Sequence, residues 1–115
     1  MSTSRIGVVG AGYVGLTTAA CMASLGHDVV CGDVDVLKLA ALSRGDVPIL
    51  EPGLPELVQE GIRSGRLSFV LGAAAASDGR DFVFLCVPTP PAPDASADLS
   101  FVEQVVCEIA PVLKT

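Results

Sequence analysis

The sequence predicts an α/β fold built on a doubly wound parallel sheet, with the strands in the order 3-2-1-4. Three observations lead to this prediction. Short apolar runs alternate with segments of helical spacing, in the order β-α-β-α-α-β-α-β-loop-α. A glycine-rich turn joins the first strand to the first helix, and an acidic residue ends the second strand. The chain has 115 residues, and half of them are apolar, which suffices for one compact domain and not for two.

The boundaries of the expected elements come from apolar periodicity and from the Gly, Pro and Asp residues that flank it. Strands are expected at 5–9, 28–33, 66–71 and 81–87, and helices at 13–26, 36–44, 54–65 and 99–113. Asp35 should cap the second helix and Asp98 the last, while Pro111 should fray the end of that last helix. Residues 72–80 form a connector of small residues with a turn or two of helix, and the proline-rich stretch 88–98 is a loop.

The motif GAGYVG, residues 10–15, matches G-x-G-x-x-G and lies between a strand and a helix, with Asp33 18 residues beyond its third glycine. This context is typical of a Rossmann-type dinucleotide site. Gly10 permits the tight turn, Gly12 lets a pyrophosphate approach the backbone, and Gly15 lets the helix pack closely on the sheet. The helix N-terminus offers free N–H groups to the phosphates. Asp33 can accept hydrogen bonds from the adenosine ribose and would repel the extra phosphate of NADP, so NAD is the expected cofactor.

Other interpretations of the same residues are a secretion signal, a membrane span and a plain tight turn. Residues 6–26 are uncharged, but only Arg5 precedes them as a positive charge, and four glycines would weaken an apolar helix by roughly 1 kcal/mol each. Thr17 and Thr18 add polar groups, so we expect no membrane insertion. The alternative role of Asp33 is a helix cap, although Asp35 fits that role better.

Ligands of such a sheet bind beyond the carboxyl ends of the strands, where three segments meet: the glycine loop, Asp33 and VPTP at 87–90. Val87 and Thr89 are therefore candidate cofactor contacts, although Thr89 fits a turn threonine equally well. Lys38 lies one turn into the second helix, near the expected ribose or an adenosine phosphate. From spacing alone, a solvated surface lysine is the stronger interpretation of Lys38.

Composition excludes several classes of partner. The net charge is −6 and the pI is about 4.4, and the seven Lys and Arg residues are scattered, so neither nucleic acid nor a membrane is expected as a partner. Cysteines 21, 31, 86 and 107 show no C-x-x-C spacing, and the chain has one His, so no metal site is expected. Each cysteine lies in an apolar run and should be a small buried side chain, which is the usage of a reducing, cytoplasmic compartment.

Together these residues resemble the N-terminal NAD-binding domain of the UDP-glucose/GDP-mannose dehydrogenase family. The matching segments are IGVVGAGYVGLTTAACMASLGHDVVCGDVD, VPILEPGLPELV, GRLSFV, FLCVPTP and ADLSFVEQVV, which cover nearly the whole chain in the family's order. The glycine loop is generic among dinucleotide-binding proteins. EPGL before a helix, followed by VPTP and ADLS, is much more specific.

The resemblance implies an oxidoreductase that converts C6 of a nucleotide sugar from an alcohol to a carboxylate while two NAD are reduced, as from UDP-glucose to UDP-glucuronate in polysaccharide biosynthesis. It places the adenosine ribose on Asp33 and Lys38. It also places Tyr13 and Val14 beside the pyrophosphate, and Thr89 in contact with the cofactor. EPGL looks like a structural loop without chemistry. A full-length enzyme would bind a nucleotide sugar and form a homo-oligomer.

Two departures from the family leave the substrate and the activity open. Pro88 stands where many glucose-specific members have Gly or Asn, and a proline recurs in relatives that act on N-acetylated sugars, whereas ADLSFV favours the glucose enzymes. A UDP-N-acetylhexosamine 6-dehydrogenase is therefore an alternative. The family's nucleophilic cysteine, catalytic lysine and sugar-binding domain lie downstream of residue 115. We therefore expect residues 1–115 to be the N-terminal part of a Rossmann-type NAD-binding domain, with an incomplete sheet, no catalytic residues and no activity alone.

The strand at 81–87 should be a central parallel strand, because it is continuously apolar. Since the next strand is expected after Thr115, the outer edge of this strand should be exposed here. A second possible function is a free-standing module that binds NAD or another nucleotide without catalysis. A third, another NAD-linked enzyme such as a hydroxyacid or acyl-CoA dehydrogenase, is disfavoured by EPGL and VPTP.

Overall fold

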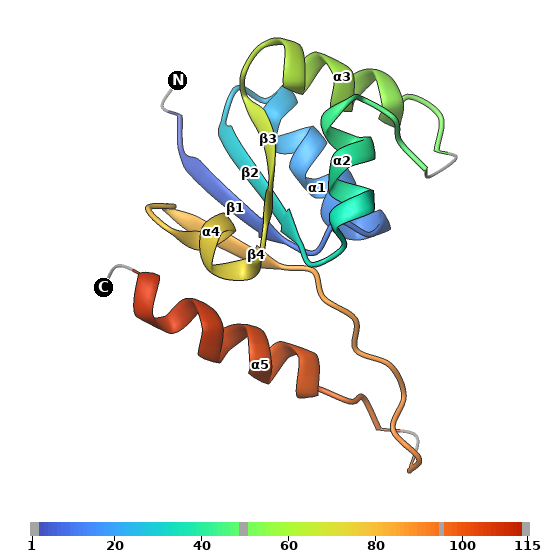
Figure 1. Cartoon of the computed structure of the whole chain (residues 1–115), viewed down its shortest axis with the longest axis vertical. Coiled ribbons are helices and arrows are strands. Elements are labelled where there is room, and N and C mark those ends of the chain that lie inside the picture. Colours follow the sequence, from blue (N-terminus) through green and yellow to red (C-terminus); the bar gives the residue numbers. More distant parts are fainter. Residues whose placement is uncertain (1–2, 49–50, 95, 114–115) are drawn as a thin grey trace.

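The structure, a computed structural model, describes residues 3–48, 51–94 and 96–113. Four parallel strands form one sheet in the order β3-β2-β1-β4, as predicted (Figure 1). The strands are β1 (Arg5–Val9), β2 (Asp28–Asp33), β3 (Leu67–Leu71) and β4 (Phe82–Leu85). The helices are α1 (Tyr13–Ser24), α2 (Val36–Ser43), α3 (Leu54–Arg63), α4 (Ala73–Ser77) and α5 (Ser100–Ile109), and a 3₁₀ turn follows at Ala110–Val112.

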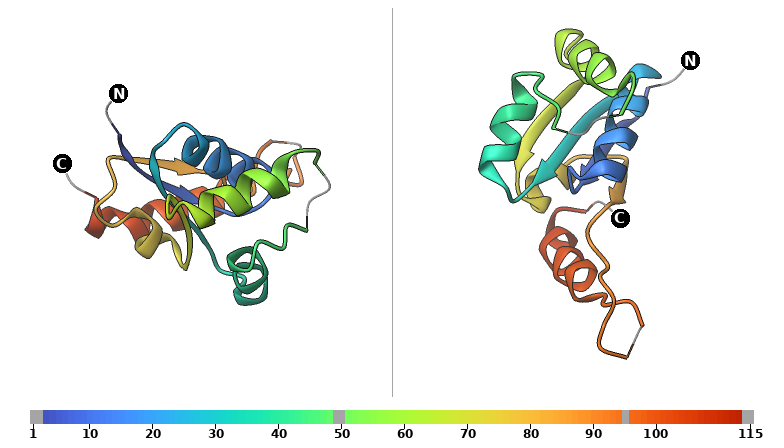
Figure 2. Two further views of the ribbon diagram at one scale, coloured as in Figure 1. Left: turned by 90° about the horizontal axis from the view of Figure 1, so that it is seen from above. Right: turned by 90° about the vertical axis from the view of Figure 1, so that its right-hand side faces the viewer.

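Helices pack on both faces of the sheet, which gives the doubly wound arrangement (Figure 2). The larger core joins α1, α2 and α3 to one face, and the side chains of Leu16, Leu42 and Val58 are fully buried in it. A smaller core on the other face joins α4 and α5 to the sheet through Ala76 and Ile109. Most of the apolar packing therefore lies on the α1 side, directly behind the glycine loop.

The inner strand β1 has a partner on each side. Ile6 pairs with Val29 of β2 and also with Phe82 of β4. The carboxyl ends of β1, β2 and β4 therefore meet at one edge of the sheet, where the connecting segments can form a common site.

Helix α4 lies close to the sheet because the strands beneath it carry glycines. A Cβ built on Gly7 would lie 2.2 Å from the Ala76 carbonyl oxygen, and one built on Gly32 would lie 2.7 Å from the Ala76 Cβ. The alanine run that was predicted as a connector with a turn or two of helix is thus a short helix seated on β1 and β2.

Strand β4 is shorter than predicted and lies at an edge of the sheet, so the prediction of a central strand over 81–87 is wrong for this chain. The strand ends before the prolines, which cannot donate backbone hydrogen bonds. The prediction of an exposed outer edge is confirmed, since β4 pairs with β1 alone among the described residues. Its side chains are exposed as well, with Phe82 60% exposed.

The helix ends follow the predicted signals with one correction. Asp35 caps α2, and its side chain accepts a hydrogen bond from the Lys38 N–H at 3.1 Å. Asp98 is not the N-cap of α5: Leu99 holds that position, and the Asp98 carboxylate accepts instead from the Ser100 N–H at 2.9 Å. Regular helix stops at Ile109, before Pro111, as expected.

The four thiols differ in exposure, which the sequence did not predict. Cys31 is buried and Cys86 is half-buried, but Cys21 and Cys107 are exposed on helices. The prediction of burial is wrong for these two, because an apolar run does not tell which helix face meets the sheet. Burial, followed by the charge of Asp33, raises the pKa of Cys31 to about 12, so that thiol stays protonated.

Across residues 3–48, 51–94 and 96–113, every helix is too short or too polar to cross a bilayer. The same residues contain no cluster of His, Cys, Asp and Glu that could hold a metal ion.

Candidate functional site

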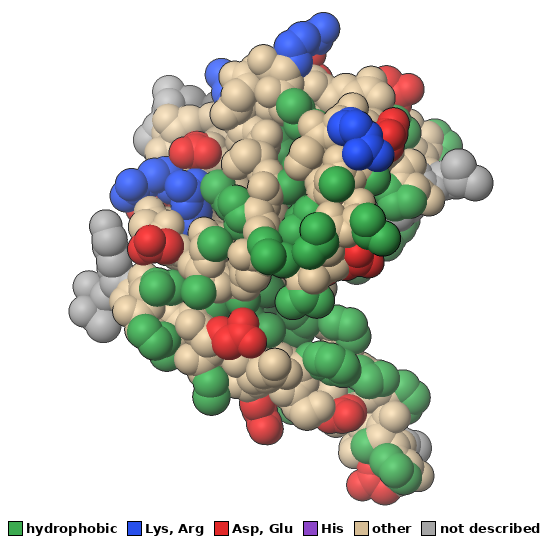
Figure 3. Space-filling model, viewed as in Figure 1, with side chains coloured by type: hydrophobic (Ala, Val, Ile, Leu, Met, Phe, Trp, Pro, Cys, Tyr) green, Lys and Arg blue, Asp and Glu red, His purple; other side chains and the backbone are tan. Residues whose placement is uncertain are grey.

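A cavity of about 860 Å³ opens where the carboxyl ends of the strands meet. In the space-filling view the surface is hollowed between the main body and α5, and hydrophobic side chains gather around the hollow (Figure 3). Eight of the nine predicted cofactor residues line this cavity: Gly10, Gly12, Tyr13, Val14, Asp33, Lys38, Val87 and Thr89. The ninth, Gly15, lies directly behind the loop.

Gly10 and Gly15 keep the turn between β1 and α1 tight. Gly10 has a φ of +104°, and a Cβ there would lie 2.3 Å from the Cys86 carbonyl oxygen. A Cβ on Gly15 would lie 1.7 Å from the Gly10 carbonyl oxygen. The absence of a side chain at Gly15 therefore lets α1 start immediately against the loop, which is the packing that the motif predicts.

Gly12 lacks a side chain for a different reason. Its φ of −76° and ψ of −165° are open to any residue, and no atom lies within 4 Å of a Cβ built on it. Neither the backbone nor the packing therefore requires glycine at this position. The open space borders the cavity, so a side chain there would fill room that an incoming ligand could use.

The N-terminus of α1 is suited to bind an anion. Gly12 is the N-cap residue and offers no side chain to the first turn, which contains no acidic residue. The backbone N–H groups at Tyr13 and Val14 therefore have no acceptor within the helix. These groups carry the partial positive charge of the helix N-terminus, beside the open space at Gly12.

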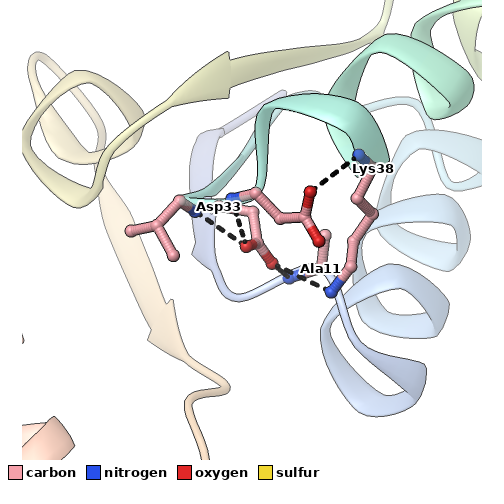
Figure 4. Close-up of polar contacts among 5 residues, drawn as sticks. Ala11, Asp33 and Lys38 are labelled. Carbon is pink, nitrogen blue, oxygen red and sulfur yellow. Dashed lines mark hydrogen bonds and ion pairs between the residues drawn. The ribbon is translucent and has the colours of Figure 1, made fainter.

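Asp33 connects the end of β2 to the glycine loop (Figure 4). Its Oδ2 accepts a hydrogen bond from the Ala11 N–H at 2.8 Å. Its Oδ1 accepts from the N–H groups of Val34 at 2.7 Å and Asp35 at 3.0 Å. Burial raises the pKa of Asp33, but these hydrogen bonds and the charge of Lys38 together hold it below the ordinary value of 3.8. The carboxylate is therefore ionised at neutral pH.

Lys38 lies against Asp33 and is not simply a solvated lysine. Its Nζ is 3.5 Å from the Asp33 Oδ2, and the two side chains are 32% and 12% exposed. The buried side chains of Leu39 and Leu42 set the rotation of α2 on the sheet, and this rotation brings Lys38 to Asp33. The interpretation favoured by spacing alone is therefore wrong, because the orientation of the helix brings this side chain back to the end of β2.

Tyr13 also lies at this site. Tyr13 borders the cavity and is 52% exposed. The nearby carboxylate of Glu51 raises the pKa of the Tyr13 phenol.

Sequence reasoning did not single out several residues of the cavity wall. The position of Val34 directly after Asp33 could have indicated it. No local signal indicates which face of α5 borders the cavity. The wall residues that were missed are Val9, Val34, Ala73, Leu85, Cys86, Phe101, Gln104, Val105 and Glu108. Pro88, which the sequence singled out only for substrate choice, also lies in the wall.

Comparisons with known proteins agree with this geometry. The family model for the "UDP-glucose/GDP-mannose dehydrogenase family, NAD binding domain" matches residues 4–115. A UDP-glucose 6-dehydrogenase from Rhizobium meliloti (strain 1021) is 48% identical over 107 residues, which are 92% of this chain and 24% of that protein.

Two solved structures superpose on the chain. A UDP-glucose dehydrogenase from Pyrobaculum islandicum is 42% identical with a TM-score of 0.90, over 94% of this chain and 25% of that one. A GDP-mannose dehydrogenase from Pseudomonas aeruginosa, solved as a ternary complex, is 40% identical with a TM-score of 0.86, over 91% of this chain and 24% of that one.

The chain spans about a quarter of the length of these relatives. The open space at Gly12, the uncapped N-terminus of α1 and the ionised Asp33 suit the pyrophosphate and ribose of NAD, the cofactor of this domain. Sequence, fold and site geometry therefore agree that the chain belongs to the UDP-glucose/GDP-mannose dehydrogenase family, in its NAD-binding domain.

Proposed function

We propose that this chain is the N-terminal, NAD-binding part of a nucleotide-sugar 6-dehydrogenase that acts on UDP-glucose, and that it binds NAD without catalysis when alone. Gly12 is the observation that carries the proposal. Nothing in the fold requires glycine there, so its open space is explained by a ligand that approaches the backbone. The family match identifies that ligand as NAD.

Different residues of the site bind different parts of the dinucleotide. The pyrophosphate lies over Gly12 and accepts hydrogen bonds from the N–H groups of Tyr13 and Val14. Val87 and Thr89, in the segment after β4, contact the bridging region. Bound NAD supplies the hydride acceptor for oxidation of an alcohol.

Asp33 accepts hydrogen bonds from the adenosine ribose. Its two oxygens already receive three backbone N–H groups and face Lys38, which about fills the acceptor capacity of a carboxylate. Lys38 is the only one of these donors that lies on a flexible side chain. A ribose hydroxyl therefore replaces the Lys38 ammonium as a donor to the Asp33 carboxylate, and Lys38 stays beside the ribose. The charge of Asp33 disfavours a 2′-phosphate, so NAD binds more tightly than NADP.

The proposed reaction belongs to the longer protein. UDP-glucose is proposed because the Rhizobium and Pyrobaculum relatives carry that name. Burial raises the pKa of both Cys31 and Cys86, which is opposite to the activation that a nucleophilic cysteine needs. We propose that the full-length enzyme works in the cytoplasm as a homo-oligomer that binds the nucleotide sugar beside this domain.

Calorimetric titration of the purified 115-residue chain with NAD tests the cofactor site. Gly12→Ala should fold as wild type, because its Cβ meets nothing, yet lose most NAD affinity. Gly53→Ala is the matched control. Gly53 is also the N-cap of a helix, but its φ is +86° and it lies outside the cavity wall, so alanine there should weaken the fold and spare NAD binding.

Circular dichroism of each variant separates folding from binding. A Gly12→Ala chain that folds and binds NAD as tightly as wild type would contradict the proposed site. Binding of NADP as tight as that of NAD would contradict the role given to Asp33. Production of NADH from UDP-glucose by the 115-residue chain would contradict the proposal that it is inactive alone.

A further inference from the structure

We propose that Gln104 and Glu108 of α5 select adenine as the base of the bound dinucleotide, by forming hydrogen bonds with the edge of that base. The inference rests on the proposed function, which places the adenosine ribose on Asp33. It gives a role to the face of α5 that borders the cavity.

The adenine of NAD lies at the Asp33 end of the cavity, because it is joined to the ribose that Asp33 is proposed to bind. The pyrophosphate at Gly12 and the bridging region at Thr89 account for the rest of the dinucleotide. Val34 directly follows Asp33, lines the cavity and is 82% exposed. An apolar side chain this exposed gains burial when the face of a base packs on it.

α5 reaches the same end of the cavity through its packing on α4. Val105 packs in the smaller core with Ala73, the first residue of α4. Ala73 also lines the cavity, and the N–H of Gly72 just before it donates to the Asp33 carbonyl oxygen at 3.0 Å. The part of α5 around Val105 is therefore tied to the segment beside Asp33.

Gln104 and Glu108 lie one turn apart on the cavity face of α5, on either side of Val105. The Gln104 Nε2 donates to the Glu108 Oε1 at 3.4 Å. This contact uses one of the two N–H groups of the amide and one of the acceptor positions of the carboxylate. The pair therefore still presents a donor beside an acceptor.

Adenine carries the matching pattern along its edge. Its exocyclic amino group donates, and the ring nitrogens on either side of that group accept. The Glu108 carboxylate accepts from the amino group, and the Gln104 amide donates to a neighbouring ring nitrogen. Hypoxanthine has a carbonyl oxygen in place of the amino group, so the carboxylate would face another acceptor. The pair thus favours adenine over a 6-oxopurine.

Calorimetric titration of the 115-residue chain with NAD and with nicotinamide hypoxanthine dinucleotide measures this preference. The two ligands share the nicotinamide, both riboses and the pyrophosphate, so the ratio of their affinities reports contacts with the base alone. Wild type should bind NAD roughly three- to tenfold more tightly than the hypoxanthine analogue, the change that one hydrogen bond ordinarily carries.

Substitutions on α5 test the two residues separately. Glu108→Gln can turn its amide oxygen toward adenine or its amide N–H toward hypoxanthine, so it should bind the two ligands within about twofold of each other. Gln104→Met keeps the length of the side chain and loses the donor, and it should bind NAD roughly three- to tenfold more weakly than wild type. Glu103→Gln is the matched control, because it makes the same change on the same helix outside the cavity wall, and it should keep the wild-type ratio.

Circular dichroism confirms that each variant is folded before its affinities are compared. A folded Glu108→Gln chain with the wild-type ratio would overturn the proposal, as would a folded Gln104→Met chain with unchanged NAD affinity. Loss of the ratio in Glu103→Gln would also overturn it, because a change of charge anywhere on α5 would then suffice. A wild-type chain that binds neither ligand would overturn the proposed function and this role with it. Equal binding of both ligands by wild type would overturn this role alone.

Discussion

Replacing Asp33 by alanine should lower both the stability of the fold and its affinity for NAD. The same carboxylate accepts backbone hydrogen bonds within the fold and is proposed to accept hydrogen bonds from the ribose. The Asp33 side chain is 12% exposed and receives the Ala11 N–H at 2.8 Å, with two further backbone N–H groups on its other oxygen. Ala11 is 2% exposed, so water cannot easily replace the lost acceptor. Val34, by contrast, is 82% exposed, and its N–H can bind water instead.

The magnitude follows from these exposures. A buried donor left without an acceptor costs about 1–3 kcal/mol. The ion pair with Lys38 adds little, since such partly exposed pairs contribute about 0–1 kcal/mol. We therefore expect the free energy of unfolding to fall by about 2 kcal/mol, which corresponds to a Tm lower by about 8 °C in a chain of this size. Loss of a charged acceptor for the ribose should weaken NAD binding by about tenfold to a hundredfold.

Urea denaturation followed by circular dichroism measures the first effect, and calorimetric titration measures the second. Asp35→Ala is the matched control, because it removes the same group two residues further on. It should lose about 1 kcal/mol with the cap of α2. Asp35 does not line the cavity, so this variant should keep its NAD affinity. If Asp33→Ala bound NAD as tightly as Asp35→Ala, or were as stable as wild type, the reasoning about Asp33 would be refuted.

Three further predictions concern pH and packing. The pKa of Asp33 is lowered in the fold, so the carboxylate stabilises the fold fully above the ordinary value of 3.8 and loses this effect as pH falls through the lowered pKa. The difference in the free energy of unfolding between wild type and Asp33→Ala should therefore stay constant from neutral pH to about pH 5. A difference that already shrinks in that range would be inconsistent with a lowered pKa. Gly7→Ala should lower the free energy of unfolding by about 3 kcal/mol in urea, because its Cβ would lie 2.2 Å from the Ala76 carbonyl oxygen; wild-type stability would show that α4 can move aside. Ser77 is 1% exposed, and its hydroxyl has no partner among the described residues, so Ser77→Ala should leave stability unchanged or raise it by about 1 kcal/mol; a marked loss would show that the hydroxyl is bonded.

The part of the site that could be predicted from sequence is the part fixed by local geometry. A strand, a tight glycine turn and a helix follow one another within residues 5–24, and Asp33 ends the adjacent strand, so their spacing alone brings them together. The strand order followed from the alternation of strands and helices after a glycine turn, which is typical of the doubly wound dinucleotide-binding fold. VPTP lies far along the chain from these segments, but it could still be placed at the same site. VPTP follows β4, and the sheet order places β4 beside β1.

The features that could not be predicted depend on how each helix is rotated on the sheet and on packing between segments that are distant in the sequence. Spacing could not show that Lys38 turns back to Asp33, since the rotation of α2 is set by its packing on the sheet. It could not show that Cys21 faces solvent, because α1 is made largely of small residues that fit either face.

The central place of β1 has a consequence for the timing of synthesis. β1 is made first, yet one of its two neighbours, β4, pairs Phe82 with Ile6 across 76 residues of chain. At ordinary translation rates this interval is roughly 4 to 15 s. During that time the backbone edge of β1 that β4 will cover has no native partner. The nascent chain is therefore most open to mispairing while β2 and β3 already exist and β4 is still being made, and aggregation in the cell should reflect this window more than the final stability of the fold.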